Sequence, residues 1–238
     1  MYEYLIGSLI FGVVWLFLFI SKKNLRKPML WTAGVYIIFS AILVSIWYFL
    51  RNYIYLGDTI VPSYWHPTTL FNLGTVTGFA GIEDILFLIF IGGIATAIYE
   101  FIHKKEIKLK KTYKPHLKAF GIAFIAFFFF LYLFPINLIY ALIFSNFMGA
   151  VILVLERKDL IMHSFIGGLS FLVVYILIFL LFLIISPSFI SDFYNIHNLT
   201  GVMLAGIPLE EYLYAFSFGL MWGPIYEYEH GEKDINSR

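Results

Sequence analysis

The chain contains no cysteine, few charged residues and none of the short motifs that mark common cofactor sites. Without cysteine there is no disulfide framework and no thiolate-ligated zinc or iron–sulfur site. The six histidines are scattered and do not show the His-Glu-x-x-His spacing of a zinc-binding helix. Dinucleotide, Walker and aspartate-rich diphosphate motifs are missing, so nothing supports flavin, nucleotide or prenyl-diphosphate chemistry. The net charge of +1 does not suggest a nucleic-acid partner.

Apolar residues dominate the composition. The chain is 61% hydrophobic and 13% charged, whereas soluble domains are roughly 45–50% apolar and about 25% charged. This composition predicts an all-α, multi-pass protein of the cell membrane. The first apolar run lacks a basic leader and a small-residue cleavage site, so we expect a retained helix and not a signal peptide.

Apolar segments that approach the length of a membrane span recur along the chain. A transmembrane helix needs about 20 apolar residues, and seven segments come near this length. They are 4–20, 29–50, a third that ends at Tyr99, 119–134, 138–155, 161–185 and a seventh that ends at Tyr226. Pro135, Ile136 and Asn137 predict a tight turn between the fourth and fifth segments.

The placement of lysine and arginine predicts the orientation, because cytoplasmic loops are enriched in both residues. With seven spans, the basic segments 21–28 and 103–118, the residues after the fifth span and the C-terminal tail all fall on one side. Only Arg51 falls on the other side. We therefore expect the N-terminus outside and the C-terminus in the cytoplasm.

Two stretches of the chain repeat one pattern of residues. Each has two adjacent acids, then a leucine, an aromatic ring, and a Tyr-Glu pair about one helix length later. The residues are Glu83, Asp84, Leu86, Phe87, Tyr99 and Glu100, and then Glu210, Glu211, Leu213, Tyr214, Tyr226 and Glu227. The repeat predicts two three-helix units, 1–102 and 136–238, joined by a basic loop and linker helix at 103–135. The linker helix would make the units parallel copies, with both acid pairs on the outer side.

The four acids are the candidates for catalysis. A lone acid in the first turn of a helix usually has a structural role, because it stabilises the helix dipole by about 0.3–1 kcal/mol. Here the acids are paired, the pairs recur, and an ionised Asp costs roughly 2.5–3.5 kcal/mol at the centre of a membrane helix. Adjacent carboxyls in a dry site can supply a proton donor and a base. We therefore interpret Glu83, Asp84, Glu210 and Glu211 as catalytic.

Aromatic rings near the acids are candidates for substrate contacts, because aromatic faces attract cations by about 0.5–2 kcal/mol. Such rings suit the protonation of an alkene and the shelter of the resulting carbocation. The candidates are Phe87, Tyr99, Tyr212, Tyr214, Trp222 and Tyr226. Two outer loops, about 51–81 and 186–206, also hold aromatic residues, including Tyr64 and Tyr194, and could cap a cavity between the units. An interface belt explains these Trp and Tyr residues equally well, and the Tyr-Glu pairs fit a surface better than a site.

The second acid pair lies in a specific motif, Pro208-x-Glu210-Glu211 followed by Leu213 and Tyr214. This motif, in two three-helix units, resembles the membrane-integral lycopene cyclase family of archaea, fungi and some bacteria. In the first unit Gly81 stands where the proline would be and Asp84 replaces the second Glu. The resemblance implies a cofactor-independent isomerase that protonates lycopene, closes a β-ring and releases the proton. It also implies a carotenoid substrate held in the bilayer, association with other carotenoid-pathway enzymes, and the four acids as proton donors and bases.

Three other functions fit parts of the pattern. A carotenoid hydratase would quench the same cation with water, and a scaffold would need no chemistry. A small proton-coupled transporter would also carry intramembrane acids and a repeat. Against a transporter, neither acid-bearing segment is visibly broken, and the spans contain no Lys or Arg to pair with a substrate.

Overall fold

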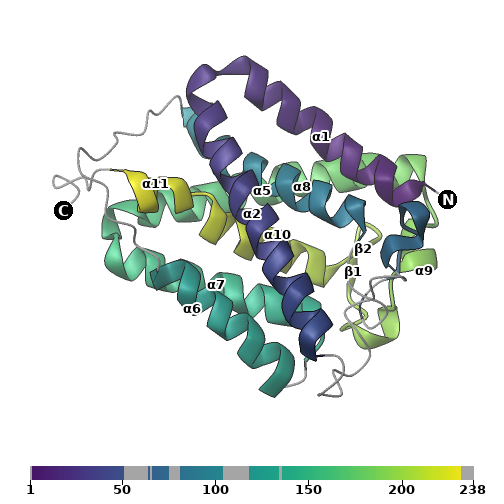
Figure 1. The fold of residues 1–238 in the computed structure, drawn as a ribbon. Coiled ribbons are helices and arrows are strands. Elements are labelled where there is room, and N and C mark those ends of the chain that lie inside the picture. Colours follow the sequence, from purple (N-terminus) through teal and green to yellow (C-terminus); the bar gives the residue numbers. More distant parts are fainter. Residues whose placement is uncertain are drawn as a thin grey trace.

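The computed structural model describes residues 2–50, 64, 66–74, 81–103, 118–133 and 136–231, which form a bundle of helices (Figure 1). The longer helices are α1 (Glu3–Ser21), α2 (Lys23–Leu50), α5 (Ile82–His103), α6 (Lys118–Phe128), α7 (Leu138–Glu156), α8 (Ile161–Ile185) and α10 (Leu209–Trp222). The shorter ones are η1 (Leu70–Asn72), the π-helical η2 (Phe129–Leu133), η3 (Lys158–Leu160), α9 (Phe189–Phe193), η4 (Ile196–Asn198) and α11 (Ile225–His230). Arg51, Pro135, most of the basic segment 103–118 and the tail 232–238 lie outside the described residues.

Within the described ranges, four helical segments are long and apolar enough to cross a membrane. They are Glu3–Ser21, Ile82–His103, Leu138–Glu156 and Lys158–Ile185. On α8, Val173, Leu177, Leu181 and Ile184 follow one another at helical spacing and are all exposed, Ile184 by 77%. A continuous apolar face of this kind is unfavourable in water and suits contact with lipid. The helical architecture therefore agrees with the prediction of a membrane protein.

Two predicted boundaries are wrong. Helix α2 begins at Lys23 and contains Pro28, so the expected basic loop 21–28 shrinks to a break at Lys22. Lysine and arginine are good helix formers, so the basic residues continue the helix, although Pro28 inside it cannot donate a backbone hydrogen bond. The seventh segment does not continue to Tyr226, because α10 ends at Trp222 and Pro224 precedes the short helix α11. Proline has no N–H to donate to the preceding turn, and its ring clashes with the carbonyl four residues back, which favours the break at Pro224.

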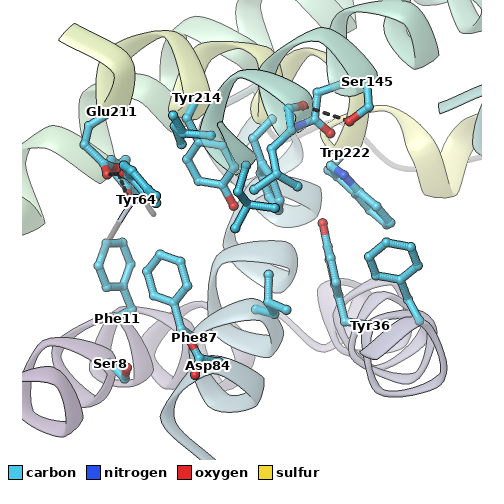
Figure 2. Close-up of a pocket in the computed structure, with 18 of the residues that line it drawn as sticks. Ser8, Phe11, Tyr36, Tyr64, Asp84, Phe87, Ser145, Glu211, Tyr214 and Trp222 are labelled. Atoms are coloured by element: carbon cyan, nitrogen blue, oxygen red, sulfur yellow. Dashed lines mark hydrogen bonds between the residues drawn. The ribbon is translucent and has the colours of Figure 1, made fainter. Parts of the chain in front are cut away.

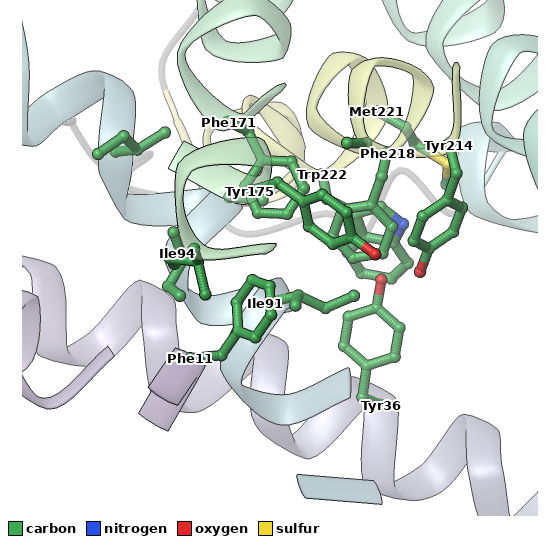
Figure 3. Packing of buried hydrophobic residues seen from close by; sticks show 14 of the residues in the cluster. Phe11, Tyr36, Ile91, Ile94, Phe171, Tyr175, Tyr214, Phe218, Met221 and Trp222 are labelled. Carbon is green, nitrogen blue, oxygen red and sulfur yellow. The ribbon is translucent and has the colours of Figure 1, made fainter. Parts of the chain in front are cut away.

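The two acid-bearing helices, α5 and α10, lie at the centre of the bundle. Helix α5 packs against α1, α2 and α8, while α10 packs against α7 and α8 and also contacts α5. Helices α6 and α7 pack side by side at the lower edge of Figure 1. Figure 3 shows that one apolar core joins the two halves, with Phe11 and Tyr36 on one side and Phe171, Phe218 and Trp222 on the other. Residues from both copies of the acid motif can therefore reach one cavity.

Helices α8 and α10 approach each other closely at two glycines. A Cβ atom on Gly219 would lie 2.8 Å from the Cβ of Phe171 and 2.9 Å from the Cα of Gly168. Small residues at such a crossing let two backbones come together, which is a common way to pack membrane helices. The contact fixes α10, and with it Glu211, against α8.

Gly219→Ala is expected to destabilise the fold by about 1–3 kcal/mol, because the added methyl forces two helices apart. Gly121→Ala is the matched control, since a Cβ there meets nothing within 4 Å. Thermal unfolding of the detergent-solubilised variants measures the difference. Equal melting temperatures for the two variants would contradict the tight α8–α10 contact.

A small β-hairpin leads into α10, an element that the all-α prediction did not contain. Strands β1 (Met203–Leu204) and β2 (Ile207–Pro208) are antiparallel. The turn residues Ala205 and Gly206 have φ of 50° and 79°, and positive φ at both positions is what a two-residue type I′ turn requires. The N–H of Leu209 then donates to the carbonyl of Val202 at 2.9 Å. The hairpin thus fixes where α10 begins.

Candidate functional site

Both acid pairs lie in the first turn of their helices, Glu83 and Asp84 in α5 and Glu210 and Glu211 in α10. Three of the four side chains are almost fully enclosed, and Glu211 is only 3% exposed. Because neighbouring residues on a helix point about 100° apart, the two members of each pair have different surroundings.

Glu211 accepts hydrogen bonds from three tyrosine hydroxyls. Tyr175 of α8 donates to Oε2 at 2.6 Å, while Tyr194 at 3.0 Å and Tyr64 donate to Oε1. Burial, followed by the nearby charge of Glu211, raises the pKa of Tyr64 and Tyr194 well above the usual range. These two hydroxyls therefore stay protonated and remain donors. Three donors on one buried carboxylate stabilise a negative charge at that point.

Asp84 has the corresponding position in the first unit, with fewer partners. The hydroxyl of Tyr4, in α1, donates to Oδ1 at 2.5 Å, and the N–H of Gly81 donates to Oδ2 at 2.7 Å. Tyr4 thus ties the start of α1 to the start of α5.

Glu83 and Glu210 hold the segments that precede their helices. The N–H of Leu70 donates to Oε1 of Glu83 at 2.6 Å. Oε1 of Glu210 accepts the N–H of Thr200 at 2.8 Å and the hydroxyl of Tyr140 at 2.7 Å. The first acid of each pair therefore fixes the backbone upstream of the helix.

A cavity of about 240 Å³ is lined by Asp84 and Glu211, the second acid of each pair, and extends along α10 to Trp222 at its end. Among the described residues that line it, these two are the only charged ones. In the view of Figure 2 the rings of Phe11 and Phe87 lie between the two carboxyls. Glu83 and Glu210, which we predicted to be catalytic, do not line this cavity.

Three of the six predicted aromatic contacts line the cavity, namely Phe87, Tyr214 and Trp222. The structure does not place Tyr99, Tyr212 or Tyr226 there. The hydroxyl of Tyr212 donates to the carbonyl of Leu204 in the hairpin at 2.9 Å. Tyr99 and Tyr226 lie toward the opposite ends of the two units, where each stacks on a histidine ring, Tyr99 on His163 and Tyr226 on His230.

The surface interpretation of the two Tyr-Glu pairs is wrong. Glu100 and Glu227 are buried, at 2% and 8% exposure, and approach one histidine, His163 of α8. No spacing in the sequence marks this cluster, because its members come from three separate helices. Apolar neighbours alone cannot show which distant polar side chains will meet.

The tyrosines that surround Glu211 were also missed as site residues, although the outer loops offered a signal. The N–H of Asn195 donates to the carbonyl of Tyr64 at 2.9 Å, and the N–H of His66 donates to the carbonyl of Phe193 at 2.8 Å. The two aromatic loops are thus paired through their backbones. Tyr64 and Tyr194 both line the cavity, which agrees with the prediction that these loops cap it.

Comparison with known proteins identifies one family. A family model described as lycopene cyclase matches residues 3–102 and 137–229, which together make up most of the chain. Both acid pairs, the tyrosines around them and the buried histidine cluster fall within the matched ranges. No curated protein and no solved structure gives a significant match.

Proposed function

Since this chain belongs to the lycopene cyclase family, we propose that it converts the linear ψ-ends of lycopene to β-rings by acid catalysis, without redox change or cofactor. The observation that carries the proposal is the pairing of Asp84 and Glu211 across one apolar, aromatic-lined cavity. Ligand sites are typically apolar with a few convergent polar groups. The polar groups here can give and take a proton, which is what cyclisation of a hydrocarbon requires.

The reaction consumes no atom overall: one proton is added to the substrate and one is removed, and the proton taken by the base must return to the donor carboxyl before the next turnover. A carboxyl O–H adds its proton to the terminal double bond of the ψ-end, which leaves a tertiary carbocation. The π electrons of a nearby internal double bond form the new ring bond and move the positive charge onto a ring carbon. A carboxylate then removes a proton from the adjacent carbon to give the ring double bond. Lycopene and its product are isomers, so no oxidant or reductant is needed.

The hydrogen bonds of the two carboxyls indicate which one acts as the base and which one as the proton donor. Glu211 has three hydroxyl donors, which favour its negative form, so we assign it the base that faces the cation. Asp84 has one hydroxyl and one backbone donor, and we assign it the proton donor. Glu83 and Glu210 position the helix starts by holding the loops before them.

Aromatic rings support the intermediate cation. Phe11 and Phe87 meet edge to face at 5.3 Å, and Phe11 also lies 5.3 Å from Tyr175. Aromatic faces stabilise a desolvated cation by about 2 kcal/mol. The cavity of about 240 Å³ is smaller than pockets of roughly 300–1,000 Å³ that enclose drug-sized ligands, so we expect it to hold one end of the polyene at a time. Its apolar lining favours cyclisation over capture of the cation by water.

For the membrane arrangement, we propose seven spans in two parallel three-helix units, 1–102 and 136–238, with the N-terminus outside and the C-terminus in the cytoplasm. The four long apolar helices and the exposed apolar face of α8 support insertion in a membrane. The matching environments of the two acid pairs support the repeat. Helix α10 has only 14 residues, and together with α11 it would form the seventh span.

Expression of the chain in a lycopene-accumulating bacterium tests the activity directly. We expect pigment chromatography to show β-ring carotenoids that are absent from the empty-vector strain. Membrane fractionation and detergent gel filtration establish that the protein is inserted and folded. Unchanged lycopene beside a folded, inserted protein would refute the proposed activity.

Tyr175→Phe is expected to slow ring formation about tenfold or more, because a hydrogen bond to a charged group contributes about 1.5–3 kcal/mol. The ring remains in place, so the cavity keeps its shape. Tyr212→Phe is the matched control, since that hydroxyl lies outside the cavity. Initial rates of product formation in membranes measure the effect, and equal rates for the two variants would show that the hydroxyl of Tyr175 does not support Glu211.

A further inference from the structure

A second polar cluster lies at the other end of the bundle from the acid pairs. Glu100 comes from the last turns of α5, His163 from the start of α8, and Glu227 from α11. Asp84 and Glu100 are separated by about 24 Å along α5 at 1.5 Å per residue. The cluster is therefore not part of the cavity that holds Asp84 and Glu211, and the proposed cyclisation does not use it.

The three side chains are arranged around the histidine ring. Nδ1 of His163 lies 2.8 Å from Oε2 of Glu227, which is hydrogen-bonding distance. This bond fixes the ring so that Nε2 faces Glu100, at 3.4 Å from its Oε1. His163 is 1% exposed, and Nε2 makes no hydrogen bond within the described part of the chain. One ligand atom from each of the three residues lies within 4.8 Å of the others.

These distances suit a shared metal ion. Two metal–ligand bonds of about 2.0–2.1 Å at a tetrahedral angle place the ligand atoms about 3.4 Å apart. That is the separation between Nε2 of His163 and Oε1 of Glu100. A metal-bound histidine usually donates its other N–H to a carboxylate or carbonyl, which is the position of Glu227. Imidazole with carboxylates is a donor set for zinc and similar divalent transition metals.

The surroundings hold the ligands in place. The ring of Tyr99 stacks on His163 with centroids 3.9 Å apart. Arg157 donates to the carbonyl of Glu227 at 3.3 Å, and its guanidinium is paired with Asp159. The histidine ring and the Glu227 backbone are thus positioned by groups that are not themselves in the cluster.

We propose that Glu100 and Nε2 of His163 bind a divalent transition-metal ion of the zinc class, while Glu227 accepts Nδ1–H and orients the ring, so that the ion joins the end of α5 to α8. The ion has a structural role, because it ties the first half of the chain to the second far from the reacting carboxyls. The recurrence of Tyr-Glu in both halves follows from this arrangement, because each half supplies one carboxylate to the histidine: Glu100 beside Nε2 and Glu227 beside Nδ1.

Zinc binding to the purified full chain in detergent tests the proposal. Protein stripped with EDTA is dialysed against zinc, and its metal content is measured by elemental analysis. We expect one zinc per chain and a melting temperature several degrees above that of the stripped protein. Stripped protein that stays folded should still form β-rings, so the result does not depend on the proposed activity.

Variants locate the ion. Glu100→Gln and His163→Gln should each weaken zinc binding at least tenfold and abolish the rise in melting temperature. Glu229→Gln is the matched control, because Glu229 is a buried carboxylate of α11 that is not among the three clustered residues; it should bind zinc as the unaltered chain does. If the unaltered chain binds no more zinc than Glu100→Gln, or melts at the same temperature with zinc and with EDTA, the proposal is wrong.

Discussion

Glu211→Gln is expected to lower the rate of β-ring formation by about 10²–10⁴-fold, the usual contribution of a general acid or base. Glutamine keeps the size, and its one carbonyl oxygen can still accept the hydroxyls of Tyr64 and Tyr194, but its NH₂ group cannot accept that of Tyr175. The amide also carries no charge and cannot take up the ring proton. The carbocation then forms without the Glu211 carboxylate opposite it, and the final removal of a proton from the ring has no base. Initial rates of lycopene consumption and product formation in isolated membranes measure the loss.

Asp192→Asn is the matched control, because Asp192 is an exposed carboxyl in the outer loop segment and does not line the cavity. It should retain the unaltered rate. Glu210→Gln provides a second comparison, since Glu210 holds the loop at Thr200 and does not line the cavity; we expect a smaller loss than for Glu211→Gln. A folded Glu211→Gln protein with the unaltered rate would remove this residue from the mechanism.

Asp84→Asn is expected to stop lycopene consumption altogether, because the assigned proton donor is gone. The Glu211 variant should differ in kind, since it can still protonate the alkene slowly and lose the cation to other products. We expect chromatography to show minor products, such as alternative ring isomers or hydroxylated pigments, for Glu211→Gln and only lycopene for Asp84→Asn. The reverse distribution of products would make Glu211 the proton donor and Asp84 the base.

Solvent isotope labelling gives an independent check on the donor. In D₂O the unaltered enzyme should place deuterium in the new ring, because the added proton comes from an exchangeable carboxyl. Lycopene that is recovered from Asp84→Asn membranes should contain no deuterium. Deuterium in the ψ-ends of that recovered lycopene would show that another group protonates the alkene reversibly.

The sequence was sufficient for the features that depend on local pattern. The apolar runs predicted a helical membrane protein, and the acid pairs were expected near the starts of two helices, where the structure places them. Of the turn predicted at 135–137, Pro135 lies outside the described residues, and the side chain of Asn137 caps α7 by accepting the N–H of Ile139. Each of these features depends on residues that are close together in the chain.

Features that depend on long-range packing were not predictable. Tyr64 reaches Glu211 from 147 positions away, and a tyrosine in an apolar sequence has no local mark that distinguishes a site from a membrane interface. The same reason applies to Glu100 and Glu227: their predicted position at helix ends indicates a surface, whereas in the fold both contact His163. The choice between the adjacent acids also depended on which helix face meets the cavity, and hydrophobic periodicity is weak in helices that are apolar all round.

The backbone pairing of the two outer loops couples access to the cavity with stabilisation of the Glu211 carboxylate. Tyr64 and Tyr194 are both donors to Glu211, and their loops are hydrogen-bonded to each other. A displacement of the paired loops that admitted a long substrate would withdraw both hydroxyls together. The Glu211 carboxylate would then be least stabilised while the loops are displaced and most stabilised once they have returned. Ring closure would accordingly be restricted to the enclosed state, and substrate exchange would set an upper limit on turnover.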